Sequence, residues 1–130
     1  MSDTSNIWVY DIEVFQNFFC VVFEHYHEPE REYFMLHHSV DDYHDLIKFL
    51  RKEVKNNSWF VGFNNLDYDA QIIEYILANN KNLTALSAHQ VCAKLFIKSS
   101  QIINGRREEG FRLPYSEYNM KTKQLDIFKL

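Results

Sequence analysis

The chain has 130 residues, of which 46% are hydrophobic and 16% aromatic. This length and composition fit one compact globular domain with a single core, and the aromatic content excludes an intrinsically disordered protein. The formal net charge of −4 argues against a protein that coats duplex DNA non-specifically, because that binding mode depends on Lys and Arg. It does not exclude a site that handles DNA through metal ions.

The sequence carries no segment that is typical of a membrane or secreted protein. No apolar run approaches the ~18 residues that a membrane span needs, and no signal peptide is visible. The two cysteines, Cys20 and Cys92, are far apart and form no Cys-x-x-Cys motif. We therefore expect a cytoplasmic protein with reduced thiols and no membrane partner.

The first part of the chain predicts three strands and a helix. Apolar and aromatic runs cover residues 7–13, 18–24 and 31–37. Turn residues separate these runs, and two successive hairpins imply an antiparallel meander. Ser39 followed by Asp42 resembles a capping box, which would open a helix that extends to about Asn56.

The rest of the chain alternates strands and helices. A short apolar strand is expected at 59–63, central and parallel to the first strand, then a helix ending near Asn79, a helix at 84–103 and a strand at 124–130. The order β-β-β-α-β-α-α-β describes an α/β domain with a mixed sheet and helices on its faces, the ribonuclease-H-like layout. No domain boundary interrupts residues 1–130.

Two acidic residues, Asp11 and Glu13, end the first strand. Residues two apart in a strand point to the same side, so the two carboxylates project together. Paired carboxylates repel each other, and the usual remedy is a hard divalent cation such as Mg²⁺ or Mn²⁺. The alternative is that the strand ends early and both acids are simply solvated.

A third acid, Asp69, follows the strand at 59–63. It lies three and four residues before Ile72 and Ile73, so it shares the helix face that packs on the sheet. If that strand lies beside the first, Asp69 can approach the paired acids and complete a site for two cations. The alternative is that Asn65 caps the helix while Asp67 and Asp69 complement its dipole; both can hold together.

Two stretches resemble the first and second exonuclease motifs of the 3′–5′ proofreading domains of phage DNA polymerases. They are Tyr10–Phe19 (YDIEVFQNFF) and Val61–Asp69 (VGFNNLDYD). Gln124–Leu130 (QLDIFKL) is similar to the strand that precedes the last helix of those domains. The resemblance, to the four-acid exonucleases of the ribonuclease-H-like fold, spans nearly the whole chain and implies a phage polymerase origin.

The resemblance implies a role for each matching residue. Asp11, Glu13 and Asp69 would be the catalytic metal ligands, Asn65 would hold a single-stranded 3′ end, and Phe15 and Phe63 would lie near the terminal nucleotides. The chain departs from the family because it ends before the Tyr-x-x-x-Asp or His-x-x-x-x-Asp helix that supplies the fourth acid. Asp126 does not match that motif; it either points toward the metals or is a solvated strand-end acid.

The expected function is two-metal-ion hydrolysis of phosphodiesters at single-stranded DNA ends, with Mg²⁺ or Mn²⁺ as cofactor. Aromatic side chains suit a single strand, because bases stack on them without sequence readout. Without the fourth acid we expect the chain alone to be a poor or inactive nuclease, which a polymerase segment or companion chain would restore. It would work in the cytoplasm, that of the host if a phage encodes it.

Two other readings stay open. One is a non-catalytic docking or DNA-holding module of a DNA polymerase with the same fold. The other is a histidine metal site built from the histidines near the second and third strands, which are His25, His27, His37 and His38. The basic residues concentrated in 105–130 either face a phosphate backbone or form a solvated surface.

Overall fold

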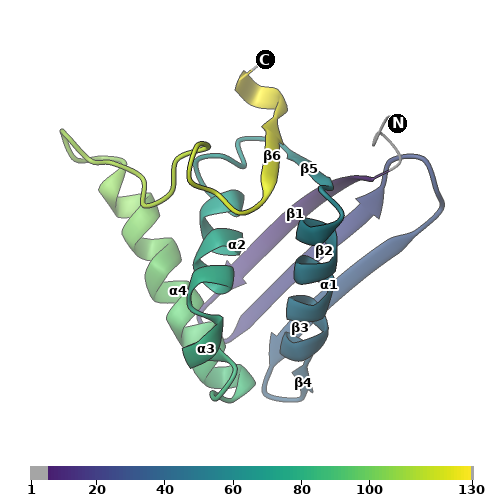
Figure 1. The fold of residues 1–130 in the computed structure, drawn as a ribbon. Helices are drawn as coiled ribbons and strands as arrows, with labels where there is room; N and C mark the ends of the chain where they lie inside the picture. Colours follow the sequence, from purple (N-terminus) through teal and green to yellow (C-terminus); the bar gives the residue numbers. More distant parts are fainter. Residues whose placement is uncertain (1–5, 130) are drawn as a thin grey trace.

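The architecture is a single mixed sheet with helices packed on it. A computed structural model describes residues 6–129 (Figure 1). The elements in chain order are β1 Ile7–Phe15, β2 Phe18–His25, β3 Arg31–His37, β4 Val40–Asp41, α1 Tyr43–Lys55, β5 Trp59–Gly62, α2 Asp69–Ala78, α3 Asn80–Leu83, α4 Ala88–Gly105, β6 Lys123–Asp126 and a 3₁₀ turn Ile127–Lys129. The α/β class expected from the sequence is therefore confirmed.

The sheet has six strands in the order β4-β3-β2-β1-β5-β6. The first four strands form an antiparallel meander. β5 pairs parallel to β1 through only three residue pairs, from Ile7 opposite Trp59 to Val9 opposite Val61, and β6 pairs parallel to β5. The predicted central, parallel position of the strand near Trp59 is confirmed. Beyond Val9, no strand formed by residues 6–129 pairs with that edge of β1.

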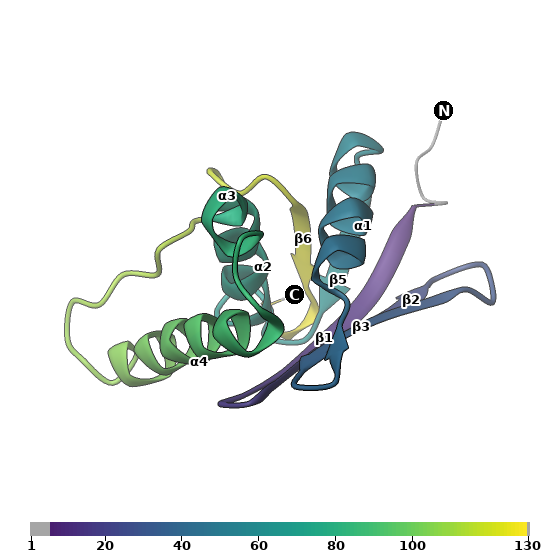
Figure 2. The ribbon, with the colours of Figure 1, turned by 90° about the horizontal axis from the view of Figure 1, so that it is seen from below.

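One face of the sheet carries the core. In β1 the side chains of Trp8, Tyr10 and Ile12 are buried, whereas the residues between them are exposed. The helices α1, α2 and α4 lie on the same side of the sheet (Figure 2). From the sequence we expected helices on both faces of the sheet. Within residues 6–129, α1, α2 and α4 cover one face only. This agrees with β1 and β2, where buried and exposed side chains alternate.

Aromatic rings make up the centre of the core. Phe23 contacts the rings of Tyr10, Phe34, Phe49 and Phe60 at centroid distances from 4.7 to 6.2 Å. These rings come from four strands and from α1, so they join the meander to the parallel part of the sheet. Part of the high aromatic content of the sequence is therefore used for packing, while other aromatic side chains, such as those of Phe15 and Phe63, are exposed.

The predicted capping box at the start of α1 is wrong. The N-cap is Asp42, and its side chain makes no capping hydrogen bond. The Oδ2 atom of Asp42 instead accepts the N–H of Met35 at 2.9 Å, and the Asp42 N–H is donated to the Met35 carbonyl at 3.1 Å. The two-residue strand β4 between Ser39 and Asp42 draws the acid toward β3, so it serves the sheet edge rather than the helix.

A genuine capping box opens α4. The Ser87 hydroxyl accepts the N–H of Gln90, and the Gln90 side chain accepts the N–H of Ser87. This motif starts the helix at Ala88, four residues after the predicted start at Thr84, because residues 80–83 form the separate short helix α3.

We expect Ser87→Ala to lower the free energy of unfolding by about 1 kcal/mol, because the first turn of α4 loses one half of a reciprocal cap. Urea unfolding followed by circular dichroism measures the change. Ser100→Ala, within the same helix, should cost less than half as much. Equal losses in the two variants would contradict the capping role.

The last strand is shorter than predicted. The pattern at 124–130 predicted one strand, but β6 ends at Asp126 and a 3₁₀ turn follows; Leu130 lies outside the described residues. The turn forms because Asp126 accepts the N–H of Phe128 through its side chain. Within residues 6–129 no helix has the length and apolar character to cross a membrane.

Candidate functional site

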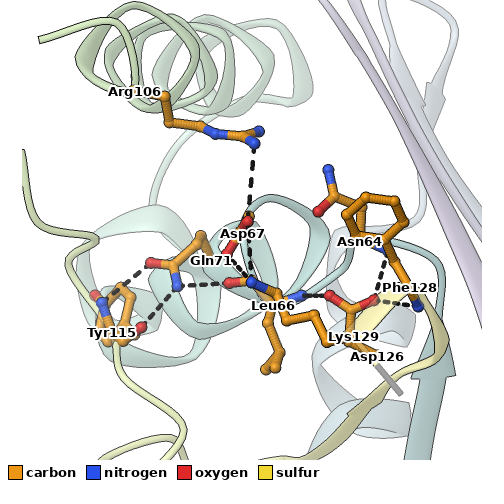
Figure 3. Close-up of polar contacts among 9 residues, drawn as sticks. All are labelled: Asn64, Leu66, Asp67, Gln71, Arg106, Tyr115, Asp126, Phe128 and Lys129. Carbon is orange, nitrogen blue, oxygen red and sulfur yellow. Dashed lines mark hydrogen bonds and ion pairs between the residues drawn. The ribbon is translucent and has the colours of Figure 1, made fainter.

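Asp126, at the end of β6, bonds the backbone of the loop between β5 and α2. Its carboxylate, which is 3% exposed, accepts the backbone N–H groups of Asn64 at 2.7 Å, Leu66 at 3.1 Å and Phe128 at 3.0 Å (Figure 3). Asn64 has φ of +59°, a left-handed conformation that Asn tolerates better than most residues. Asp126 therefore fixes the path of the loop. The alternative of a solvated strand end is wrong, because the carboxylate is buried; the alternative of a metal-facing acid stays a prediction.

A second acid holds the same loop from its outer side. Asp67 forms ion pairs with Lys129 at 3.2 Å and with Arg106 at 3.7 Å (Figure 3). These contacts join the loop to the end of α4 and to the turn after β6. One alternative from the sequence gave Asp67 and Asp69 as partners of the α2 dipole; Asp69 lies in the first turn of α2, and Asp67 precedes the helix by two residues.

Asp69 reaches from α2 to the sheet. It is the first residue of the helix and 8% exposed, and its Oδ2 atom accepts the N–H of Ile12 at 3.1 Å. That N–H is on the edge of β1 that continues past the short pairing with β5. The predicted approach of Asp69 to the first strand is thus present, and it depends on the early departure of β5.

The carboxylates of Asp11 and Glu13 flank this contact. Both residues are exposed and project from the face of β1 opposite the core, one on each side of Ile12. Burial, followed by the negative charge of Asp11, raises the pKa of Asp69 to about 7, against the lowering effect of the Ile12 and Asp69 backbone N–H groups. Glu13 adds a smaller upward contribution. The three acids therefore interact electrostatically, and the charges on Asp11 and Glu13 disfavour ionisation of Asp69.

The donor set suits a hard cation, but the side chains are not gathered around one point. Carboxylate oxygens are the ligands that Mg²⁺ and Mn²⁺ prefer. Across residues 6–129, no group of three or more His, Cys, Asp or Glu side chains is arranged to hold a metal ion. Exposed side chains such as those of Asp11 and Glu13 can change rotamer, whereas Asp69 is fixed by its hydrogen bond.

Asn65 belongs to a buried polar network. It is fully buried, and its Nδ2 atom donates to Gln124 Oε1 at 2.8 Å, the same atom that accepts the Tyr10 hydroxyl at 2.7 Å. The Gln124 amide in turn donates to Thr122, whose hydroxyl donates to Glu74. The Asn65 side chain does not cap α2, whose N-cap is Tyr68. Its Oδ1 atom finds no hydrogen-bond partner among the residues that the structure describes.

The two aromatic residues assigned to nucleotide contacts are both exposed. Phe15 is 56% and Phe63 66% exposed. Phe63 lies at the end of β5 and meets Phe128, itself 60% exposed, edge to face with ring centroids 5.0 Å apart. Phe128 was not singled out from the sequence, because the pattern placed it inside a strand.

Comparisons with models of known families, with curated proteins and with solved structures find no match. Any function assigned to this chain therefore depends on the geometry of its own residues.

The histidines do not form a common site. His25 and His27 lie at the turn between β2 and β3, where His25 Nδ1 accepts the N–H groups of His27 and Glu28. His37 and His38 lie at the opposite end of β3, where His37 Nδ1 accepts the Ser39 N–H. The length of β3 separates the two pairs, so the histidine metal site is wrong for these four residues.

Sequence reasoning missed the polar residues that hold the C-terminal segment. Gln71 on α2 bonds the backbone N–H and C=O of Tyr115 (Figure 3), and Glu74 accepts the N–H groups of Lys121 and Thr122. Both are at least 98% buried. The available signal was that they interrupt the apolar face of α2 next to Ile72 and Ile73, where a polar side chain needs a partner.

Proposed function

We propose that this chain is a 3′–5′ exonuclease module with a ribonuclease-H-like arrangement, acting on single-stranded DNA ends with two Mg²⁺ or Mn²⁺ ions. One observation carries the proposal. Asp69, from a helix, bonds the amide between Asp11 and Glu13, and the mutual charge of the three acids helps to raise its pKa to about 7. Among residues 6–129 none of these three carboxylates forms an ion pair. Divalent cations stabilise carboxylates that lie close together in this way.

The chain's own residues would act as ligands and supports. Asp11, Glu13 and Asp69 would hold the ions, and Asp69 needs to lose its proton to do so. When bound, such ions supply a more acidic water molecule and charge stabilisation for the leaving 3′-oxygen. Asp126 would act as a positioning residue, since it sets the loop that leads into Asp69.

Exposed aromatic side chains would receive the bases. Phe15 and Phe63 are exposed enough for stacking, which tolerates any base. Arg106 and Lys129 add positive charge beside the same loop. The assignment of Asn65 to the 3′ end remains a prediction. Because its amide is buried, we propose that it acts first by holding the loop through Gln124.

A second candidate is a non-catalytic docking or DNA-holding module, part of a DNA polymerase. It is favoured by the lack of a ligating group of three side chains within the described part of the chain. Under either candidate we propose a cytoplasmic protein that works with a polymerase segment or a companion chain, which for the nuclease would supply the fourth acid.

Calorimetry with Mn²⁺ distinguishes the two candidates. The nuclease proposal expects a binding heat that disappears in Asp11→Asn and in Glu13→Gln and that persists in Glu28→Gln, a change in the exposed β2–β3 turn. Absence of heat, or heat that is equal in all four proteins, would favour the docking module.

Activity is measured on a 3′-labelled single strand with Mn²⁺. We expect slow release of the terminal nucleotide by the chain and none above background by Asp11→Ala. Because the chain alone is expected to be a poor enzyme, long incubations at high enzyme concentration are required. Release that survives the substitution would rule out the proposed site.

A further inference from the structure

Arg31 and Tyr33 of β3 pair with β2 on one side, but on the outer side of β3 they pair with no strand formed by residues 6–129. β4 pairs only with Leu36 and His37, and Asp42 satisfies the N–H and C=O of Met35. Because Met35 bonds away from β2, the alternation of an antiparallel ladder turns the N–H and C=O groups of Tyr33 and Arg31 to the same edge. Among residues 6–129 no backbone group pairs with them there.

A groove runs along this edge, between β3 and α1. It has a volume of about 490 Å³. Its lining residues are Glu32, Tyr33, Phe34, Asp42, Asp45, Lys48, Phe49 and Lys52. The rings of Phe34 and Phe49, with centroids 5.5 Å apart, form its apolar floor. An exposed strand edge beside a helix is the geometry in which an extended peptide can add to a sheet.

The charges of the groove are separated along its length. α1 starts beside Met35 and runs back toward the beginning of β3 (Figure 1). Asp42 and Asp45 therefore stand at one end of the groove. Lys48 and Lys52 lie toward the other end together with Glu32, which leaves that end with a net charge of +1. None of these five side chains forms an ion pair with any described residue. The Asp42 carboxylate already accepts the Met35 N–H through Oδ2, so the side chains offered to a partner are mainly those of Asp45, Lys48 and Lys52.

We propose that the groove binds an extended peptide as an added strand antiparallel to β3, with a basic side chain first, an apolar one in the middle and an acidic one last. An antiparallel strand would run from the Asp42 end to the Lys52 end. Asp42 and Lys52 are ten positions apart, which corresponds to ~15 Å along a helix, and side chains at i and i+4 of a strand are ~13 Å apart. The pattern Lys-x-Val-x-Glu therefore fits the charges and the floor. The inference is independent of the nuclease proposal.

A second copy of the chain fits this groove less well. Its own β3 edge would need a free apolar side chain for the floor, but Phe34 and Leu36 on the helix side of β3 are 6% and 1% exposed and belong to the core. The free edge is also only four residues long, which is short for a stable pairing of two sheets.

The test is a titration of the ¹⁵N-labelled full chain with two blocked peptides of identical composition. The first is Thr-Lys-Thr-Val-Thr-Glu-Thr and the second exchanges its Lys and Glu. We expect the first to bind about 5-fold more tightly and to shift the amides of residues 31–34 and 48–52. Equal affinity, shifts elsewhere or no binding at millimolar peptide would overturn the proposal, as would a peptide-independent dimer that uses this edge.

Two variants identify the contacts. Tyr33→Pro removes the outward N–H, a change that an edge strand tolerates, together with the Tyr33 ring that lines the groove. It should weaken binding of the first peptide more than Tyr33→Ala, which removes the ring and keeps the N–H. The double variant Asp45→Lys with Lys52→Glu keeps the net charge but abolishes the charge difference between the ends of the groove that favours the first peptide, so it should remove the preference for that peptide. Lys55→Glu, on the same helix but outside the lining, should leave the preference in place. A double variant that keeps the original preference would refute the charge-directed orientation.

Discussion

Asp69→Asn is expected to stabilise the protein at pH 8, by about 2–4 kcal/mol in a metal-free buffer. The pKa of Asp69 is raised from 3.8 to about 7, so the folded state holds this proton more tightly than the unfolded chain. Between pH 4 and 7 the unfolded state therefore binds fewer protons, and stability falls as the pH rises. Three pKa units correspond to about 4 kcal/mol. Asn does not ionise, so Asp69→Asn avoids this loss of stability at high pH, and its amide oxygen can still accept the Ile12 N–H.

The measurement is urea unfolding of both proteins at pH 4 and pH 8 with a chelator present. The free energies of unfolding of the unsubstituted protein and Asp69→Asn should be nearly equal at pH 4 and differ at pH 8. Glu28→Gln should have the same free energy of unfolding as the unsubstituted protein at both pH values. Mg²⁺ should then stabilise the unsubstituted protein more than Asp69→Asn, because a ligand that binds only the folded state adds to its stability. A difference in unfolding free energy between the two proteins that is the same at pH 4 and pH 8 would refute the raised pKa of Asp69. A difference at pH 8 that Mg²⁺ does not change would count against the cation site alone.

Asp126→Ala is expected to lower the free energy of unfolding by about 3–5 kcal/mol. The substitution removes the acceptor of three backbone N–H groups, those of Asn64, Leu66 and Phe128. Hydrogen bonds to a buried charged group contribute about 1.5–3 kcal/mol each, and donors left without an acceptor keep their desolvation cost. Asp126→Asn should lose less, since one oxygen can still accept from Asn64 and Phe128.

Chemical denaturation gives the stability change, and hydrogen exchange of the Asn64 and Leu66 amides localises it. Asp67→Ala is the matched control, because it removes an acid from the same loop whose ion pairs are with exposed side chains; it should cost less than about 1 kcal/mol. A similar small cost for Asp126→Ala would mean that the loop does not depend on this carboxylate.

The candidate site could be predicted only in part. The alternation in β1 placed Asp11 and Glu13 on one side, and the spacing to Ile72 and Ile73 turned Asp69 toward the sheet. Both patterns are local, so the sequence carries them directly. The contact itself joins residues 57 positions apart. It exists because β5 leaves β1 after Val9, and no local pattern fixes where a parallel pairing ends.

The roles of polar residues were the least predictable part of the fold. Ser39 and Asp42 were expected to form a capping box, but the Asp42 side chain bonds β3. One alternative gave Asn65 as the cap of α2, but its side chain bonds Gln124. A carboxylate or amide accepts equally from a helix start, a strand edge or a distant loop. Its sequence neighbours therefore do not identify its partner.

By itself the amino-acid sequence determined the α/β class, the meander, the parallel strand near Trp59 and the sides on which the acids project, because these follow from the periodicity of apolar residues along short segments. Only the tertiary structure decided that α1, α2 and α4 share one face, that Asp126 anchors the loop before α2, and that the β3 edge opens onto a charged groove. Those features depend on which distant segments meet, and their hydrogen bonds and charges are satisfied only after the chain has packed.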